Sequence, residues 1–196
     1  MRLRDYGLTF LAICISIGYF YCLDIPQTLE ANLKEHPYFM TATQFNFLYF
    51  GTYISQFIFL VPLGVLVDSF ALSTLMPIML AITIFSESII GVVLGSRFNG
   101  YIGVLVVLRG ISGINGLGVM IIQGKLIDKF AHPHYEYIMG LCLNLPNLFT
   151  AANSLITSSI ASNTGNLPLC FFVGAFTCAL SLLVSLTIIK LFLSPA

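Results

Sequence analysis

Long uninterrupted runs of apolar residues dominate the chain. Six of them approach the roughly 20 residues that a helix needs to cross the hydrocarbon core of a bilayer, and short polar segments separate them. A membrane β-barrel would instead show shorter segments in which apolar and polar residues alternate. The pattern predicts six membrane-spanning helices, at about residues 6–23, 43–67, 74–94, 101–122, 137–160 and 168–193.

The composition agrees with a membrane location. Hydrophobic residues make up 58% of the chain and charged residues 8%, whereas a soluble domain carries about 25% charged residues. Lys plus Arg and Asp plus Glu balance at 8 each, so no basic surface for nucleic acid is expected. Because the six runs are closely joined, we expect an all-α fold in which residues 1–196 form a single six-helix transmembrane bundle.

The basic residues at the span ends predict an orientation. The side of the membrane that carries more Lys and Arg is the cytosolic one. If the amino terminus is cytosolic, that side receives Arg2, Arg4, Lys125, Lys129 and Lys190, and the other side receives Lys34 and Arg97. Both termini are therefore expected in the cytosol.

Three ionisable residues, Asp24, Glu87 and Arg109, lie inside or at the rim of predicted spans. A charged residue at a helix centre costs roughly 2.5–3.5 kcal/mol on insertion scales, so each needs a partner or a water-filled cavity. Glu87 precedes the outer end of the third span by about 8 residues, and Arg109 follows the start of the fourth by about the same number, which places both roughly 12 Å deep. Two interpretations stay open: Glu87 and Arg109 form a buried charge pair, or Arg109 faces a central cavity and meets an anionic group of a solute.

Small and polar residues in the later spans predict close packing. Gly110, Gly113 and Gly116 follow Arg109 at a spacing of three, which lets another helix approach closely. Asn147 and Asn153 in the fifth span either form hydrogen bonds between helices or line a polar path.

The sequence offers no support for an enzyme. It contains no zincin motif, nucleophile elbow or phosphate-binding loop. The segment His132-Pro133-His134 supplies too few ligands for a metal site. We therefore expect no catalytic residues, no metal and no cofactor.

Four segments resemble the major facilitator superfamily, and more closely its lysosomal dipeptide-transporter branch. They are GYFYCLDIPQTL (Gly18–Leu29), TQFNFLY (Thr43–Tyr49), GVLVD (Gly64–Asp68) and RGISGINGLGVMIIQ (Arg109–Gln123), and the likeness covers about residues 16–160. The resemblance implies transport of a small solute, such as a dipeptide or an amino-acid-like compound, by alternating access. It also implies a lysosomal or other endomembrane location.

The superfamily fold has twelve spans in two halves with the solute between them, so this chain resembles the amino-terminal six-span half. A second copy or a partner membrane protein is expected to complete the carrier. The resemblance implies a cavity lined by Asp24, Tyr49, Arg109, Asn115 and Asn147, with Gly64 and Asp68 in the loop motif. Asp24 would lie at the outer or lumenal mouth, where it gates the path or coordinates a cationic group, and Glu87 would be a buried counter-charge.

The chain departs from the family at two positions. Leu117 stands where the family has an acidic residue in the fourth span, and Asn147 where it has a basic residue in the fifth. These departures fit an alternative function, a non-transporting membrane scaffold or accessory subunit derived from such a transporter.

Overall fold

The computed structural model describes residues 3–35, 38–96, 100–131 and 134–193, and every regular element in these ranges is a helix. Arg2, Arg97, His132 and Pro133 of the sequence argument lie outside the described residues. The elements are α1 (Leu3–Cys14), α2 (Ile17–Leu23), α3 (Ile25–Thr28), α4 (Glu30–Lys34), α5 (Ala42–Ser69), α6 (Leu72–Ser96), α7 (Tyr101–Ala131), α8 (Tyr135–Thr164), α9 (Leu167–Ile188) and a π-helical turn η2 (Ile189–Leu193). The predicted all-α class is confirmed.

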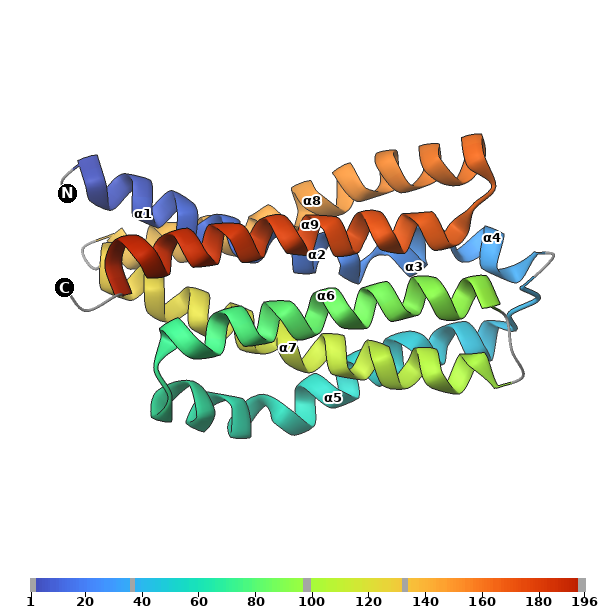
Figure 1. Cartoon of the computed structure of the whole chain (residues 1–196), viewed down its shortest axis with the longest axis horizontal. Helices are drawn as coiled ribbons and strands as arrows, with labels where there is room; N and C mark the ends of the chain where they lie inside the picture. The colour runs from blue at the N-terminus through green and yellow to red at the C-terminus, as the bar shows by residue number, and fades with distance from the viewer. Residues whose placement is uncertain (1–2, 36–37, 97–99, 132–133, 194–196) are drawn as a thin grey trace.

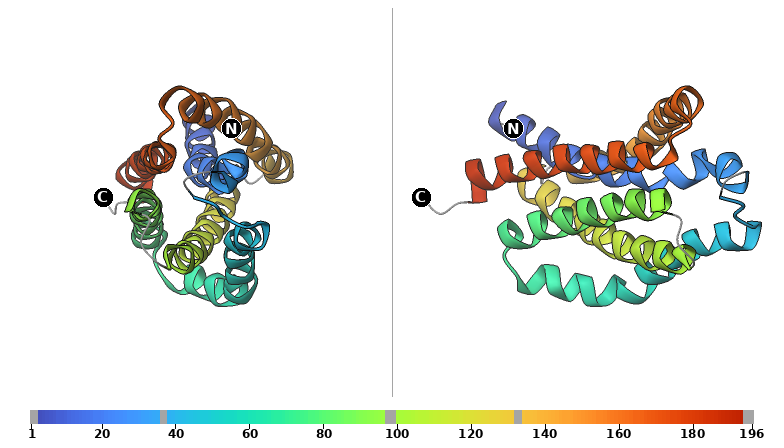
Figure 2. Two further views of the ribbon diagram at one scale, coloured as in Figure 1. Left: turned by 90° about the vertical axis from the view of Figure 1, so that its right-hand side faces the viewer. Right: turned by 45° about the vertical axis from the view of Figure 1, so that its right-hand side comes forward.

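The helices form an elongated bundle in which the chain runs back and forth along one axis (Figure 1). The four short helices α1–α4 together make the first pass, and α1 begins at the end of the bundle where η2 lies. Viewed end-on, the first pass lies between α8 and α9, and α6 packs against both α7 and α9 (Figure 2).

Five stretches of the described chain are long and apolar enough to cross a membrane: Gly7–Thr28, Ala42–Ser69, Leu72–Ser96, Tyr101–Phe130 and Leu167–Leu191. They match five of the six predicted spans. The remaining one, the fifth in chain order at residues 137–160, corresponds to α8. This helix runs along the bundle (Figure 1), but it is less apolar than the other five and is not among the helices apolar enough to cross a membrane. Asparagine, serine and threonine residues along α8 lower its hydropathy, so the six-span count stays a prediction.

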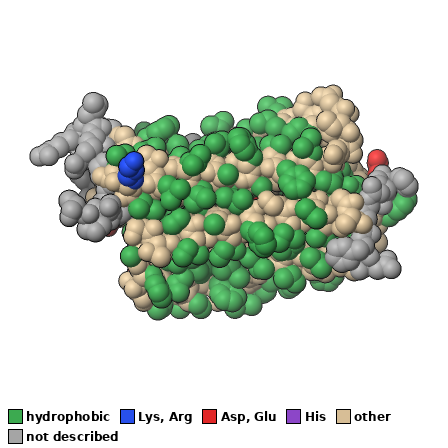
Figure 3. Space-filling view, in the orientation of Figure 1, with side chains coloured by type: hydrophobic (Ala, Val, Ile, Leu, Met, Phe, Trp, Pro, Cys, Tyr) green, Lys and Arg blue, Asp and Glu red, His purple; other side chains and the backbone are tan. Residues whose placement is uncertain are grey.

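The outer surface is apolar over most of the bundle length. Figure 3 shows one face on which hydrophobic side chains dominate and the charged side chains lie only near the two ends. Large side chains such as Phe57, Val61, Phe85 and Leu155 are 68–79% exposed. A soluble monomer rarely exposes so much contiguous apolar surface, so this belt suits contact with lipid.

Glycines bring the helices of the core into close contact. A side chain at Gly113 would place its Cβ 2.8 Å from the carbonyl oxygen of Thr52 on α5, and one at Gly116 would overlap the Tyr19 ring on α2. The predicted close approach along this glycine stripe is confirmed. The closest backbone contact of the first pass is elsewhere: a Cβ at Gly18 would lie 2.6 Å from the Cα of Cys178 on α9.

Cys22 and Cys178 offer a chemical test of this contact. Both thiols are fully buried, and their sulfur atoms are 3.4 Å apart between α2 and α9. Diamide accepts two electrons and two protons as two thiols become one disulfide, so treatment of membranes should yield a Cys22–Cys178 bond within one chain, detected by peptide mass spectrometry. Recovery of Cys22 paired mainly with Cys14 or Cys142 would contradict the packing of α2 on α9.

Candidate functional site

The first pass is broken at Asp24. Helix α2 ends at Leu23, α3 begins at Ile25, and Pro26 lies in the first turn of α3. Proline has no N–H group, so Pro26 cannot form the helical hydrogen bond to the carbonyl oxygen of Cys22, four residues earlier. The carbonyl oxygen of Cys22 accepts from the N–H group of Asp24 instead, and a carbonyl oxygen can accept from a second donor.

Arg109 on α7 supplies further donors at the break. Its Nη1 atom donates to the carbonyl oxygen of Cys22 at 3.1 Å, and its Nη2 atom donates to that of Leu23 at 2.6 Å. The side chain is 3% exposed. A cation at the carboxyl end of a helix is also favoured by the partial negative charge of the last carbonyl groups. Arg109 thus joins α7 to the break in the first pass.

Glu87 on α6 neutralises this buried cation. Its Oε1 atom lies 3.3 Å from Nη1 of Arg109 and accepts a hydrogen bond from Ser112 Oγ at 2.9 Å. Ser112 follows Arg109 by one helical turn, and Glu87 is fully buried. The hydroxyl of Ser86 donates to the carbonyl oxygen of Leu108 at 2.8 Å and holds α6 against α7 at this level. Of the two interpretations left open by the sequence, this geometry is that of the buried charge pair.

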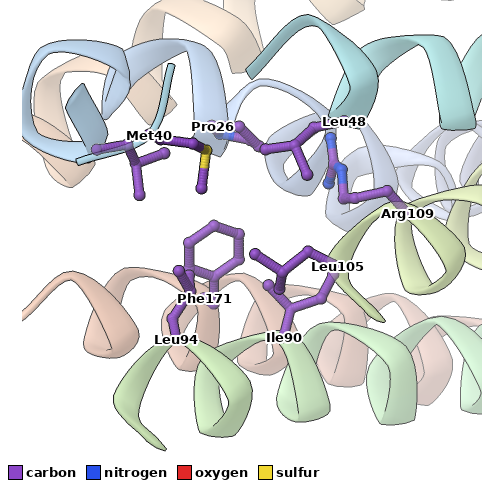
Figure 4. Close-up of a pocket in the computed structure, with 9 residues that line it drawn as sticks. Pro26, Met40, Leu48, Ile90, Leu94, Leu105, Arg109 and Phe171 are labelled. Atoms are coloured by element: carbon purple, nitrogen blue, oxygen red, sulfur yellow. The ribbon is translucent and has the colours of Figure 1, made fainter. Parts of the chain in front are cut away.

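Two buried polar atoms at this level, Glu87 Oε2 and Arg109 Nε, have no hydrogen-bond partner within the described protein. The cavity that Arg109 borders has a volume of about 10 Å³ and is otherwise apolar. Figure 4 shows Arg109 near Leu48 at one end, with Phe171 and Leu105 across the cavity. Such a volume holds about one water molecule, so no solute fits against Arg109 in this conformation.

Asp24 lies beside this network but faces α8. Its carboxylate accepts a hydrogen bond from the hydroxyl of Thr150, and the side chain is half-buried. Asn153 donates to the hydroxyl of Thr28 at 3.3 Å and accepts from Thr157 at 2.6 Å. The inward polar face of α8 therefore binds the first pass through hydrogen bonds, and Asn153 belongs to that face.

The structure separates the remaining candidates from Arg109. Asn115 is buried, donates to the carbonyl oxygen of Ile111 at 2.8 Å, and borders a different, apolar cavity of about 370 Å³ between α5, α6 and α7. Asn147 is exposed on α8. Tyr49 lies on α5 within electrostatic range of both Asp24 and Arg109. Asp24, Tyr49, Glu87 and Arg109 are thus brought together, and Asn115 and Asn147 are not.

The loop motif lies at the opposite end of α5. Gly64 is within the helix, and no other atom lies within 4 Å of where its Cβ would be. Asp68 forms a salt bridge with Lys125 of α7, which also donates to the carbonyl oxygen of Val67 at 3.1 Å. Sequence patterns cannot reveal this pairing, because the two residues are 57 positions apart.

Comparisons of the chain with protein-family models, with curated proteins and with solved structures find no match. The features of this chain that bear on its function are the break at Asp24, the buried charges beside it and the polar face of α8.

Proposed function

We propose that this chain is a six-helix half of a carrier of the major facilitator type, which moves a small solute across a membrane by alternating access. The observation that carries the proposal is the Arg109–Glu87 pair at the break of the first pass. Charged groups within a span usually mark a solute or ion path. Interrupted helices with free backbone groups line the solute sites of many carriers.

In this proposal α8 also spans the membrane, as the fifth of six spans, and both termini are cytosolic. Dipeptides or amino-acid-like compounds are the first solutes to test, in an endomembrane such as that of the lysosome, because the resemblance of Gly18–Leu29 and Arg109–Gln123 implies them. Asp24, with its half-buried carboxylate, is the group that meets the solute. Arg109 and Glu87 hold the break in place from behind.

The cavity beside Arg109 favours a second function, a membrane scaffold or accessory subunit without transport. That cavity of about 10 Å³ admits no solute. Three further protein groups bind the guanidinium and its counter-charge: the carbonyl groups of Cys22 and Leu23 and the hydroxyl of Ser112. A carrier must open this region during its cycle, whereas a scaffold keeps it closed.

Solute uptake separates the two functions. Sealed vesicles from cells that make the chain should accumulate radiolabelled alanyl-alanine saturably, above vesicles from cells that lack it. Asp24→Asn keeps the size of the side chain and an acceptor for Thr150. It should lower solute uptake at least tenfold, while the variant protein is present in the membrane at the normal level. Glu30→Gln on α4 is the control, because Glu30 pairs with Lys34 at the surface. Equal uptake with and without the chain, over a panel of dipeptides and amino acids, would favour the scaffold.

A further inference from the structure

The larger cavity that Asn115 borders, of about 370 Å³, lies between α5, α6 and α7. Glycines hold the first half of α5 tightly against α7. A Cβ at Gly51 would lie 2.8 Å from the carbonyl oxygen of Val106, and one at Gly113 would lie equally close to that of Thr52. Figure 1 shows the two helices crossing and then diverging toward the carboxyl end of α5. Helix α6 closes this wedge only in part, and the cavity remains between the three helices.

The cavity opens toward the surrounding lipid. Its walls belong to three of the stretches that are long and apolar enough to cross a membrane. Phe59, Ile78 and Ile82 at its rim are 40–48% exposed, whereas Leu63 and Met79 further in are at most 5% exposed. None of the described side chains that line it carries a charge. An occupant therefore enters from the bilayer and is uncharged.

Asn115 brings one polar side chain into these apolar walls. It is 7% exposed, and its Nδ2 atom donates to the carbonyl oxygen of Ile111 at 2.8 Å. Within the described ranges we find no donor for its Oδ1 atom. Asn115 follows the first residue of α7, Tyr101, by 14 positions and precedes the last, Ala131, by 16. The acceptor therefore lies near the middle of the membrane, where water does not supply a donor.

We propose that this cavity binds a lipophilic alcohol, whose hydroxyl donates to Oδ1 of Asn115 and whose hydrocarbon part fills the space between α5, α6 and α7. The volume is within the roughly 300–1,000 Å³ of small-molecule sites, which are mostly apolar with a few polar groups. A hydroxyl supplies the donor at the least cost, since an amide would bring a carbonyl oxygen that needs a partner of its own. The inference does not depend on the proposed carrier function.

A phospholipid fits the cavity less well than such an alcohol. Its polar headgroup stays at the membrane surface, so only a methylene chain would reach the level of Asn115. That chain has no donor, and the amide oxygen would stay without a hydrogen bond, which is unfavourable in an apolar environment.

Photolabelling of the purified full chain in lipid nanodiscs tests the inference. The probes are 1-octanol with a diazirine in its chain and the methyl ether of the same molecule, which lacks the hydroxyl hydrogen. Peptide mass spectrometry should find saturable insertion of the alcohol at residues 59–66 or 75–82. Half-saturation should need about three- to tenfold less alcohol than ether, the factor expected for one hydrogen bond inside a membrane. Phe176 on α9, 63% exposed, reports contact with dissolved probe, so its labelling should be unsaturable and equal for both.

Three variants assign the site. Asn115→Leu keeps the approximate size of the side chain and should remove the preference for the alcohol. Asn144→Leu is the matched control, because Asn144 also donates to a carbonyl oxygen four residues earlier, that of Gly140 at 2.7 Å, but is exposed on α8. It should leave the preference unchanged. Ile78→Trp places a larger ring at the exposed rim of the cavity and should abolish saturable labelling by both probes.

The other possible occupants give different results. Equal half-saturation by the two probes would overturn the inference and favour a lipid acyl chain. Labelling of the cavity walls that does not saturate, as at Phe176, would also overturn it, because another protein surface would then cover the cavity. An unchanged preference in Asn115→Leu would contradict the role of its amide oxygen. If that variant does not fold, the probe pair and Ile78→Trp still decide.

Discussion

Arg109→Ala and Glu87→Ala should each lower the stability of the purified protein strongly, and the double variant should recover much of the loss from either. Each single change leaves a charge stranded in low dielectric, which costs about 3–5 kcal/mol in soluble proteins. In membranes the unfolded reference state also finds partners, so the cost is smaller. Thermal unfolding of the three variants measures it.

The structure predicts that the two single variants differ. Arg109→Ala strands Glu87 and also removes a donor from each of the carbonyl groups of Cys22 and Leu23, whereas Glu87→Ala leaves Arg109 with both carbonyl partners. Arg109→Ala should therefore be the less stable single variant, and the double variant should stay below the unmodified chain.

The control is the same comparison at a surface ion pair: Lys34→Ala, Glu30→Ala and the double variant. This i,i+4 pair is about 40% exposed, and such surface pairs contribute less than about 0.5 kcal/mol. Strictly additive losses at Glu87 and Arg109 would rule out their coupling. If Arg109 meets solute instead, the Arg109→Ala protein should be present in the membrane at its normal level but take up no solute. Adding Glu87→Ala should then restore neither stability nor uptake.

Gly18→Ala is expected to destabilise the bundle in spite of the better helix propensity of alanine. The new Cβ would lie 2.6–2.8 Å from backbone atoms of Cys178 and Thr177 on α9, and a backbone cannot rotate away as a side chain does. Gly18 also donates its N–H to Ser181 Oγ at 3.0 Å, a bond that depends on this approach. Overpacking of this kind costs about 1–3 kcal/mol.

Gly64→Ala is the matched control for Gly18→Ala. Gly64 is also within a predicted span, but no atom lies within 4 Å of its Cβ position. A helical glycine with room for a Cβ gains up to about 1 kcal/mol from replacement by alanine. Gly64→Ala should therefore be neutral or stabilising in thermal unfolding. Equal losses from both changes would contradict the close packing of α2 and α9.

The sequence predicted the depth of the charges better than their partners. Counting residues at 1.5 Å each from the ends of two adjacent spans put Glu87 and Arg109 at one level, where the structure also has them in contact. The carbonyl groups of Cys22 and Leu23 could not be predicted as ligands of Arg109, because that contact joins residues 86 and 87 positions apart. Pro26 was the available signal, since it frees a carbonyl group four residues earlier.

The faces of the helices were harder to predict than their existence. Asn115 follows Arg109 on α7, yet six residues turn it by about 240°, and it borders the cavity between α5 and α6 instead. The spacing of Gly113 and Gly116 predicts that they are packing residues. Gly18 makes a closer backbone contact with α9 and belongs to no such repeat, so periodicity could not reveal it.

A carrier built from two halves should need two copies of this chain to transport solute. Purified chain with one fluorophore per copy can be reconstituted at low density, so that vesicles hold zero, one or two copies, and uptake and copy number are recorded vesicle by vesicle. In the proposed carrier one copy supplies one wall of a central path, so vesicles with one copy should show no uptake and those with two copies should accumulate solute. Uptake by vesicles that hold a single copy would contradict the account of this chain as half of a carrier.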